Sequence, residues 1–252
     1  MHTPVFSIIT ITYNAARWVE RTILSVLSQS YSGVEYIVID GGSTDGTVDI
    51  IKQYAQGIAY WVSEKDNGIY DAMNKGLRKA TGDYVWFINA GDTLYTSDTL
   101  QRIVSLIEKK KNLPDIIYGE TAIVDENGRS LGRRRLKAPA KLSWKSFRMG
   151  MKVCHQSFVA KRRIAPMYDL SYRYSSDFDW CIRCMKQAGK IYNTRQTLTN
   201  FLDGGVSTSQ RKASLKERYE IMCRYYGKIS TTLLHVWFAL RFYAAKLVKG
   251  RV

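Results

Sequence analysis

Short apolar runs alternate with longer segments that favour helices through the first half of the chain. The runs at residues 5–13 and 34–40 are rich in β-branched residues and lack polar alternation, which is typical of parallel strands buried on both faces. Alternation at this spacing predicts an α/β fold with a doubly wound, mainly parallel sheet. In chain order, we expect strands at 5–13, 34–40, 58–63, 84–89 and 115–119, and helices at 15–30, 44–56, 70–80 and 98–111.

The second half has a less regular pattern. A basic stretch at residues 129–152 predicts a long loop or a hairpin, and an acidic pair, Asp177 and Asp179, follows it. Two helices are expected at the C-terminal end. We therefore expect one α/β domain over residues 1–210, made of halves 1–128 and 129–210, followed by a helical, basic extension over residues 211–252.

Polar residues gather at the ends of the predicted strands. The first strand ends in Thr12-Tyr13-Asn14, the second in Asp40-Gly41-Gly42, and a later one in Asn89-Ala90-Gly91-Asp92. Ligands of doubly wound sheets bind beyond the carboxyl ends of the strands, so these tips are the predicted site. The chain has neither the GxGxxG motif of dinucleotide-binding proteins nor the GxxxxGK[ST] motif of P-loop proteins, which argues against both of these protein classes.

Charged residues are distributed unevenly between the two halves of the chain. Its 252 residues are 45% hydrophobic and 24% charged, an ordinary globular composition that excludes disorder, collagen and coiled coil. The formal net charge is +16, yet residues 1–128 carry 11 basic and 16 acidic side chains, whereas residues 129–252 carry 27 and 6. The second half is therefore expected to face an anionic partner, either nucleic acid, a phosphorylated substrate or a membrane surface.

The C-terminal segment has an amphipathic pattern. At helical spacing, His235, Arg241, Lys246 and Lys249 share one arc and apolar residues of 233–248 cover the rest, as in helices that lie in a membrane interface. A helix packed on its own core or on a second subunit is the alternative. The N-terminus lacks a secretory signal pattern, and four irregularly spaced cysteines indicate reduced thiols, so we expect a cytoplasmic location at the inner face of the membrane.

Five motifs follow one another in the first half of the chain. They are Ile9-Thr10-Ile11-Thr12-Tyr13-Asn14, Asp40-Gly41-Gly42-Ser43-Thr44-Asp45-Gly46-Thr47, Asn67-Gly68-Ile69-Tyr70-Asp71-Ala72-Met73-Asn74-Lys75-Gly76, Ala80-Thr81-Gly82-Asp83-Tyr84 and Asn89-Ala90-Gly91-Asp92. In these motifs and their order the chain resembles the family 2 glycosyltransferases, which are inverting enzymes with the GT-A fold, and it is most similar to the bacterial branch that builds O-antigen and other cell-surface polysaccharides. The resemblance is close over residues 5–95 and weaker beyond.

The resemblance implies roles for residues of the first half in binding a nucleotide-sugar donor. Thr12, Tyr13 and Asp40, with Asn14 beside them, match positions around the nucleobase, which is expected to be uracil. A second group matches the segment that borders the ribose and diphosphate: Asp66, Asp71, Asn74 and Lys75, of which Lys75 would balance phosphate charge.

A divalent cation, Mg²⁺ or Mn²⁺, is also implied, although the motif that holds it is reduced here. Family members commonly have a run such as Asp-Ala-Asp-Asp, whereas this chain has Asn89-Ala90-Gly91-Asp92 and keeps one carboxylate of three. A hard cation bound to substrate phosphates needs few protein carboxylates, so Asp92 is the expected metal ligand.

An inverting transfer needs a base for the acceptor hydroxyl, and Asp177 matches the family's position for it. Asp179 is expected either to support that carboxylate or to begin a helix. His155 is a candidate for contact with the acceptor or the diphosphate, although a lone histidine is more often structural.

The sequence thus favours an inverting glycosyltransferase whose acceptor is a sugar, expected on a polyprenyl diphosphate. Two alternatives are a basic nucleic-acid-binding protein and another sugar-nucleotide enzyme, such as a nucleotidyltransferase. No helix-turn-helix, zinc-finger or RNA-binding sheet motif supports the first, and no Gly-rich, Lys-ending phosphate loop near the N-terminus supports the second. We therefore expect no nucleic-acid partner.

Overall fold

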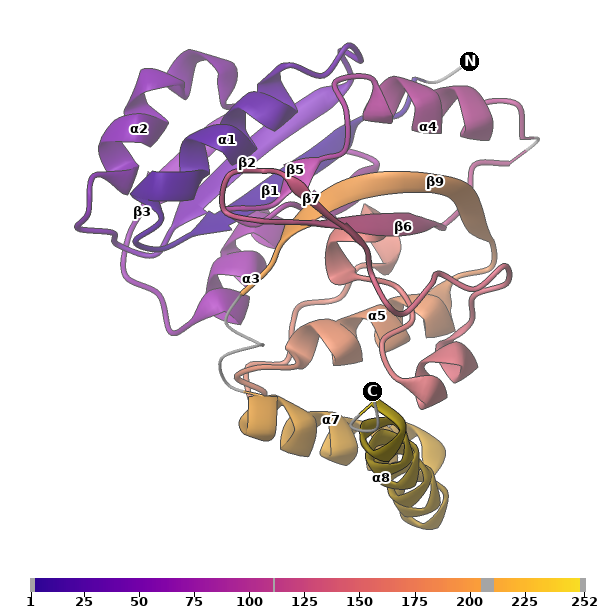
Figure 1. Cartoon of the computed structure of the whole chain (residues 1–252). Coiled ribbons are helices and arrows are strands. Elements are labelled where there is room, and N and C mark those ends of the chain that lie inside the picture. Colours follow the sequence, from indigo (N-terminus) through magenta and orange to yellow (C-terminus); the bar gives the residue numbers. More distant parts are fainter. Residues whose placement is uncertain (1–2, 111, 205–210, 250–252) are drawn as a thin grey trace.

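The computed structural model describes residues 3–110, 112–204 and 211–249. Its centre is a nine-stranded mixed sheet with the strand order β3-β2-β1-β4-β8-β6-β9-β5, and β7 pairs with β6 (Figure 1). The strands are β1 (Phe6–Thr12), β2 (Val34–Asp40), β3 (Tyr60–Ser63), β4 (Tyr84–Phe87), β5 (Thr93–Leu94), β6 (Ile116–Val124), β7 (Ser130–Arg133), β8 (Phe158–Lys161) and β9 (Ile191–Leu202).

The helices follow the predicted alternation in the first half and close the chain at its C-terminal end. The pair α7 and α8 lies below the sheet in Figure 1, next to α5. The α-helices are α1 (Ala16–Leu27), α2 (Thr47–Gln53), α3 (Ile69–Lys79), α4 (Thr99–Ile107), α5 (Ser176–Gln187), α7 (Arg211–Tyr226) and α8 (Lys228–Lys249), and the short 3₁₀ helices are η1 (Ala55–Gly57), η2 (Trp144–Met149), η3 (His155–Ser157) and η4 (Arg162–Ile164).

Strand β1 is parallel to both of its neighbours, β2 and β4. The chain runs outward from β1 through β2 to β3, then returns to place β4 on the other side, so the strand order reverses at β1. A crevice opens beyond the carboxyl ends of the strands at such a reversal. The prediction of a GT-A-like, mainly parallel sheet flanked by helices is thereby confirmed, with β8, β7 and β5 as antiparallel additions.

Two apolar cores lie on opposite faces of this sheet. Ile9 and Ile11 of β1 belong to the core that includes residues of α3 and α5, whereas Phe6 and Ile8 belong to the core that includes residues of α1 and α4. Side chains alternate between the faces of a strand, and here both faces are covered. This is why the sequence of β1 is apolar at nearly every position.

Some predicted boundaries move in the structure. The helix expected from residue 44 begins only at Thr47, because Gly46 has a left-handed backbone with φ 92°. The strand expected to end at residue 119 continues to Val124 as β6, because it pairs with β9 and β7. The basic stretch after residue 128 contains the second strand of that hairpin, β7, followed by a loop and η2.

Helices α7 and α8 confirm the two predicted C-terminal helices. They are separated by Gly227, whose φ of 83° suits a residue just past a helix end, and its N–H donates to the carbonyl of Cys223. His235, expected on the polar arc of α8, instead lies edge-on against Tyr219 of α7. None of the described helices combines the length and hydropathy needed to cross a bilayer.

Candidate active site

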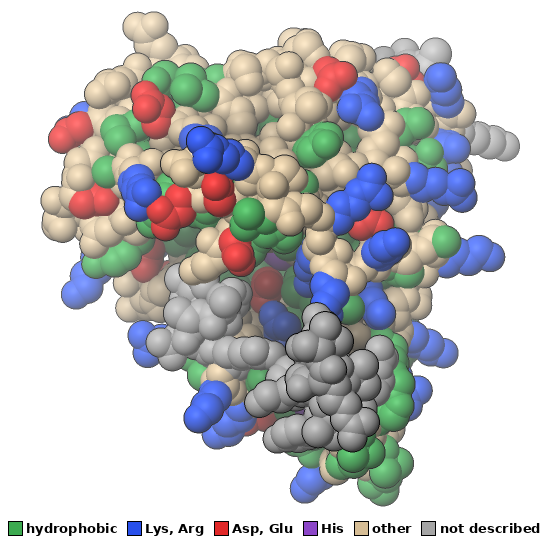
Figure 2. Space-filling view, in the orientation of Figure 1, with side chains coloured by type: hydrophobic (Ala, Val, Ile, Leu, Met, Phe, Trp, Pro, Cys, Tyr) green, Lys and Arg blue, Asp and Glu red, His purple; other side chains and the backbone are tan. Residues whose placement is uncertain are grey.

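The tips of β1, β2 and β4 lie at one edge of the sheet, because β1 is parallel to both of the other strands. In the same orientation as Figure 1, the space-filling view shows a hollow in the middle of this face (Figure 2). Acidic and basic side chains stand at the mouth of this hollow, and basic side chains dominate the surface to its right. The edge is thus the part of the molecule where residues from several strands and loops reach a common space.

Tyr13, Gly41 and Asp66 meet at the tips of β1 and β2. The Tyr13 ring is 65% exposed, so it stands in solvent at the strand tip and is not part of the core. A Cβ added to Gly41 would lie 2.5 Å from Asp66 Oδ2 and 3.3 Å from the Tyr13 ring. The Asp66 carboxylate therefore occupies the space that a side chain at position 41 would fill, beside an exposed aromatic face.

The carboxylate of Asp40, expected beside the nucleobase, is hydrogen-bonded by the protein itself. This carboxylate is buried and accepts hydrogen bonds from the backbone N–H groups of Gly42 and Ser43, from Ser43 Oγ and from Ser63 Oγ, at 2.5–3.0 Å. These four bonds shape the loop after β2 and join it to β3. Asp66 keeps more of its carboxylate free: it is half-buried, its Oδ1 accepts from the backbone N–H of Gly68 at 2.8 Å, and no hydrogen bond to its Oδ2 is found among the described residues.

Two oxygen atoms at the strand tips have no partner. Thr12 Oγ1 and Asn89 Oδ1 are buried and make no hydrogen bond within the described residues. A buried polar atom without a partner is costly, so such atoms at a strand edge indicate a missing donor. Asn14 is different, because its Oδ1 accepts from Thr44 N–H and its own N–H donates to Ser43 Oγ, which fixes the two loops together.

The predicted site residues of helix α3 make hydrogen bonds and an ion pair within the protein. Asp71 accepts from the backbone N–H of Asn67 at 3.1 Å and stabilises the turn before the helix. Asn74 is buried and makes two hydrogen bonds, of 2.7 and 3.0 Å, to the backbone of Tyr168 in the second half. Lys75 donates to the carbonyl of Lys65 and pairs with Glu64 at 2.8 Å. The charge of Lys75 is therefore already balanced.

Asp177 stands half-buried in the first turn of α5, opposite the start of α3. Tyr70 of α3 donates its phenolic hydroxyl to Asp177 Oδ1 at 3.2 Å, and the backbone N–H of Phe178 donates to the same oxygen at 2.8 Å. Burial, reinforced by the Asp177 carboxylate, raises the pKa of Tyr70 well above its ordinary value, so the phenol keeps its proton and acts as a donor. The structure thus holds a carboxylate of the second half against the helix that borders the strand tips.

Comparisons with known proteins agree with this geometry. The family model "Glycosyl transferase family 2" matches residues 7–165. This chain belongs to glycosyl transferase family 2. An uncharacterized glycosyltransferase of Mycobacterium tuberculosis is 35% identical over 186 residues, which cover 71% of this chain and 68% of that protein. A "PGL/p-HBAD biosynthesis glycosyltransferase" of Mycobacterium bovis is 34% identical over 198 residues, 76% of this chain and 73% of its own length.

Solved structures share the fold of this glycosyltransferase. TarS of S. aureus, residues 1–349 in complex with UDP-GlcNAc, superposes with a TM-score of 0.69 at 16% identity, over 95% of this chain and 73% of that one. A mannosyltransferase of Pyrobaculum calidifontis in complex with GDP-Man and Mn²⁺ has a TM-score of 0.62 at 17% identity, over 99% and 80% of the two chains. The family membership makes the protein a nucleotide-sugar-dependent glycosyltransferase.

The metal expected from the resemblance does not fit the residues at the tip of β4. Asp92 is 5% exposed, its Oδ1 accepts from the N–H of Leu202 at 2.9 Å, and the Gln156 side chain hydrogen-bonds to its carboxyl group. Gly91 has no side chain and a φ of 101°, and an added Cβ would lie 2.8 Å from Leu202. The tip itself therefore offers only neutral oxygens, whereas a hard divalent cation prefers anionic ones.

The wider structure leads to the same conclusion. Across residues 3–110, 112–204 and 211–249, no three His, Cys, Asp or Glu side chains cluster in a way that could hold a metal ion. The neutral oxygens of Thr12 and Asn89 fit hydroxyl or N–H donors of a nucleoside better than they fit a cation.

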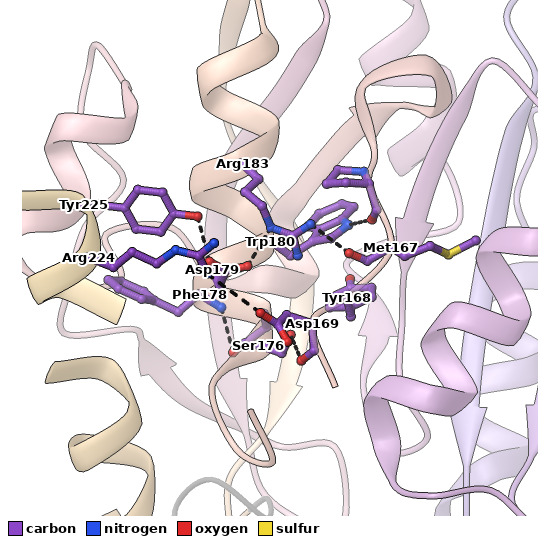
Figure 3. A network of polar contacts seen from close by, with 12 residues as sticks. Met167, Tyr168, Asp169, Ser176, Phe178, Asp179, Trp180, Arg183, Arg224 and Tyr225 are labelled. Atoms are coloured by element: carbon purple, nitrogen blue, oxygen red, sulfur yellow. Dashed lines mark hydrogen bonds and ion pairs between the residues drawn. The ribbon is translucent and has the colours of Figure 1, made fainter. Parts of the chain in front are cut away.

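Asp179 binds residues of α5 and α7. It is fully buried, accepts from Arg183 Nε at 2.6 Å and from Tyr225 of α7 at 2.7 Å (Figure 3). Arg183 also donates to the carbonyl of Met167, and Arg224 lies 3.8 Å from Asp169. No hydrogen bond joins Asp179 to Asp177 among the described residues. Asp179 thus fixes α7 and the loop at 167–169 to α5.

His155 lies inside the core next to the site. It is 3% exposed, its Nε2 lies 2.7 Å from the Tyr168 hydroxyl, and Phe87 and Trp180 pack around its ring. Burial lowers the pKa of His155 to about 4 despite the opposing effect of Asp177, so the imidazole is neutral near pH 7. This places it behind the site, where it supports Tyr168.

Sequence reasoning missed Tyr70 and the pairing of Gly41 with Asp66. Tyr70 occupies an apolar position of an amphipathic helix, and nothing in its spacing distinguishes it from a core residue. The space left by Gly41 is filled by a residue 25 positions further along the chain, a proximity that depends on the turn after β3.

The neutral state of His155 predicts a pH dependence of stability. The folded pKa of about 4 lies below the ordinary 6.5, so the stabilisation is complete above pH 6.5 and is lost as the pH falls towards 4. Between pH 7 and 4, the free energy of unfolding should fall by about 3 kcal/mol more in the wild type than in His155→Gln. Urea titrations across this range measure the difference.

Asp92 makes this comparison between variants necessary. Burial raises its pKa to about 7, so its own contribution to stability rises as the pH falls through that value, opposite to the effect of His155. Asp92 is present in both proteins and cancels in the difference. Equal pH dependence of the two proteins would show that His155 is not held neutral.

Proposed function

We propose that this protein is an inverting glycosyltransferase in which Asp177 is the base. The observation that carries the proposal is the Tyr70–Asp177 hydrogen bond, which fixes a carboxylate at the start of α5 next to the strand tips where the donor of this family binds. A nucleotide sugar is the donor, and UDP-linked sugars are the first to test, because Asp66 and the exposed Tyr13 ring suit a base with a ring N–H.

The reaction follows from these positions. The Asp177 carboxylate takes the proton of the acceptor hydroxyl as its oxygen attacks the anomeric carbon of the donor sugar. The bond between that carbon and the diphosphate oxygen breaks, and the nucleoside diphosphate leaves with the electron pair. Attack opposite the leaving group inverts the anomeric configuration.

Donor recognition is assigned to the strand tips. The Tyr13 ring lies against the nucleobase, Asp66 accepts its ring N–H, and Thr12 and Asn89 receive hydrogen bonds at their unpartnered oxygens. Asn14, Asp40, Asp71, Asn74 and Lys75 hold the loops around the donor. A cation on Asp92 forms no part of the proposal, because that carboxyl group is buried and hydrogen-bonded.

The acceptor is assigned as a sugar on a polyprenyl diphosphate, in the assembly of a bacterial cell-surface glycan. Support comes from α8, which carries a stripe of exposed apolar residues, and from basic residues of η2 beside its start, where Arg148 donates to Ser230. Figure 2 shows hydrophobic side chains gathered at this lower end with Lys and Arg around them. The stripe comprises Ile229, Leu233, Val236, Trp237 and Leu240.

We therefore place the protein at the cytoplasmic face of a bacterial membrane, bound peripherally through α8. Basic side chains beside an apolar helix face suit an anionic lipid surface. The chain divides into a donor-binding half at 1–128, an acceptor-side half at 129–210 and a membrane-binding helical extension at 211–252. The basic side chains of residues 241–249, which belong to the predicted polar arc, lie outside the described side chains.

Replacement of the base gives the first test of the proposal. Asp177→Asn removes the proton acceptor but keeps the size of the side chain, so we expect kcat to fall by roughly 10²- to 10⁴-fold while nucleotide binding changes less than about threefold. Release of nucleoside diphosphate from a panel of nucleotide sugars, with a lipid-linked acceptor extract, measures the first quantity. Isothermal titration with the nucleoside diphosphate measures the second.

Asp49→Asn is the matched control, because Asp49 is an exposed carboxylate on α2, and it should leave both quantities unchanged. Full turnover by Asp177→Asn would reject Asp177 as base. Failure of every nucleotide sugar to support turnover by the wild type would count against the donor assignment as a whole.

The apolar stripe of α8 gives a test of membrane binding. In the triple variant Leu233→Ser, Trp237→Ser and Leu240→Ser, the apolar area available to lipid falls, so co-sedimentation with phosphatidylglycerol vesicles should drop at least tenfold. Leu24→Ser, which alters an exposed leucine of α1, is the control and should bind as the wild type does. Equal sedimentation of the triple variant and the wild type would contradict the assignment of α8.

A further inference from the structure

The leaving diphosphate needs positive charge, and its source in this protein is not the expected metal. A departing nucleoside diphosphate is stabilised by Arg or Lys side chains or by a divalent cation. The tip of β4 presents Asn89 and Gly91, and the carboxyl group of Asp92 is turned into the core. A side chain of this chain must therefore supply the charge, provided that the proposed function holds.

Most cations near the site are already paired. Lys75 binds Glu64 and the carbonyl of Lys65, and Arg183 binds Asp179. Arg21 donates to the carbonyls of Gly91 and Glu126. None of these side chains is available without giving up an existing contact.

Arg218 of α7 differs from these cations. Among the described residues its guanidinium group forms neither an ion pair nor a hydrogen bond, and its Nε is buried, whereas Arg21 and Arg183 use other guanidinium nitrogens for the contacts above. Partial burial of a guanidinium group without a partner costs desolvation free energy, and a bound anion would offset that cost. Its lack of a partner therefore indicates a ligand of negative charge.

The stretch of α7 that carries Arg218 packs beside the start of α5. Ser214, one turn earlier on the same face, hydrogen-bonds to Ser175 at the start of α5, and Ile221, on the next turn, lies in the core shared with α3 and α5. Burial raises the pKa of Tyr70, and the positive charge of Arg218 opposes that rise, so the guanidinium group lies within electrostatic range of the phenol that donates to Asp177. The guanidinium group thus belongs to the space where the starts of α3 and α5 meet.

We propose that Arg218 binds the donor's diphosphate and supplies the positive charge that a divalent cation supplies elsewhere. A planar guanidinium group donates two parallel hydrogen bonds to phosphate oxygens, which fixes the leaving group as well as stabilising it. Nucleotide binding then needs no metal. The acceptor's own phosphates are the competing source of the same chemistry, and the test separates the two.

The test measures binding of UDP, GDP, uridine and guanosine to the full-length protein by isothermal titration in the presence of EDTA. For whichever diphosphate binds the wild type, Arg218→Gln should weaken affinity roughly 10- to 100-fold, while the affinity of the matching nucleoside stays within twofold. Arg218→Lys keeps the charge but loses the pair of parallel hydrogen bonds, so its affinity for the diphosphate should lie between those of the wild type and Arg218→Gln.

Lys216→Gln is the matched control, because it removes one positive charge from an exposed position of the same helix. It should leave all affinities unchanged. Circular dichroism and thermal unfolding show whether each variant is folded, and if Arg218→Gln is not, Arg218→Lys carries the comparison.

Four results would overturn the inference. The first is an unchanged diphosphate affinity in a folded Arg218 variant, and the second is an equal loss of nucleoside affinity. The third is a change confined to the KM of the lipid-linked acceptor, which would assign Arg218 to the acceptor's phosphates. The fourth is diphosphate binding by the wild type that EDTA abolishes and Mn²⁺ restores. If neither UDP nor GDP binds the wild type under any condition, the proposed donor fails and Arg218 loses its role with it.

Discussion

The contact between α3 and the segment that leads into α5 holds the two halves of this molecule in one geometry. Asn74 exchanges two buried hydrogen bonds with the backbone of Tyr168, and Tyr70, one turn before it, donates to Asp177. Both residues of α3 belong to the first half of the chain, and both partners belong to the second half. Because these bonds are largely buried, a shift of one half against the other leaves polar groups unpaired.

The carboxylates at the strand tips differ in how many hydrogen bonds they accept from the protein. The Asp40 carboxylate accepts hydrogen bonds from the backbone of the loop that follows β2. Gly41 has no side chain, and the Asp66 carboxylate lies in the space that one would fill. At the end of β4, the Asp92 carboxyl group is buried, and the side chain of Asn89 offers a neutral oxygen at the tip. A site with so few free carboxylates suits a substrate that brings its own negative charge.

Much of the fold could be predicted from the sequence, because its first half folds through local and sequential pairings. The apolar runs of β1 and β2 are buried on both faces, and the helices between them follow in order. The second half depends on distant pairings, such as β9 lying between β6 and β5, and no local period encodes these.

The candidate site was predictable in position but not in detail. The family motif locates Asp177 and the strand tips, whereas the partners of Asp40, the inward turn of Asp92 and the free state of Arg218 depend on residues that only the folded chain brings together. A motif gives the residue type at a position, while burial and hydrogen bonding decide which atoms remain for a ligand.

The central claim is that Tyr70 acts on catalysis through Asp177, and a double-mutant cycle in kcat tests it most directly. The four proteins are the wild type, Tyr70→Phe, Asp177→Asn and the double variant, measured at saturating donor and acceptor. Loss of one hydrogen bond to a charged group should lower kcat by about tenfold in Tyr70→Phe. The same change should have less than about a twofold effect in the Asp177→Asn background. Equal factors in the two backgrounds would contradict the account, because Tyr70 would then act independently of Asp177.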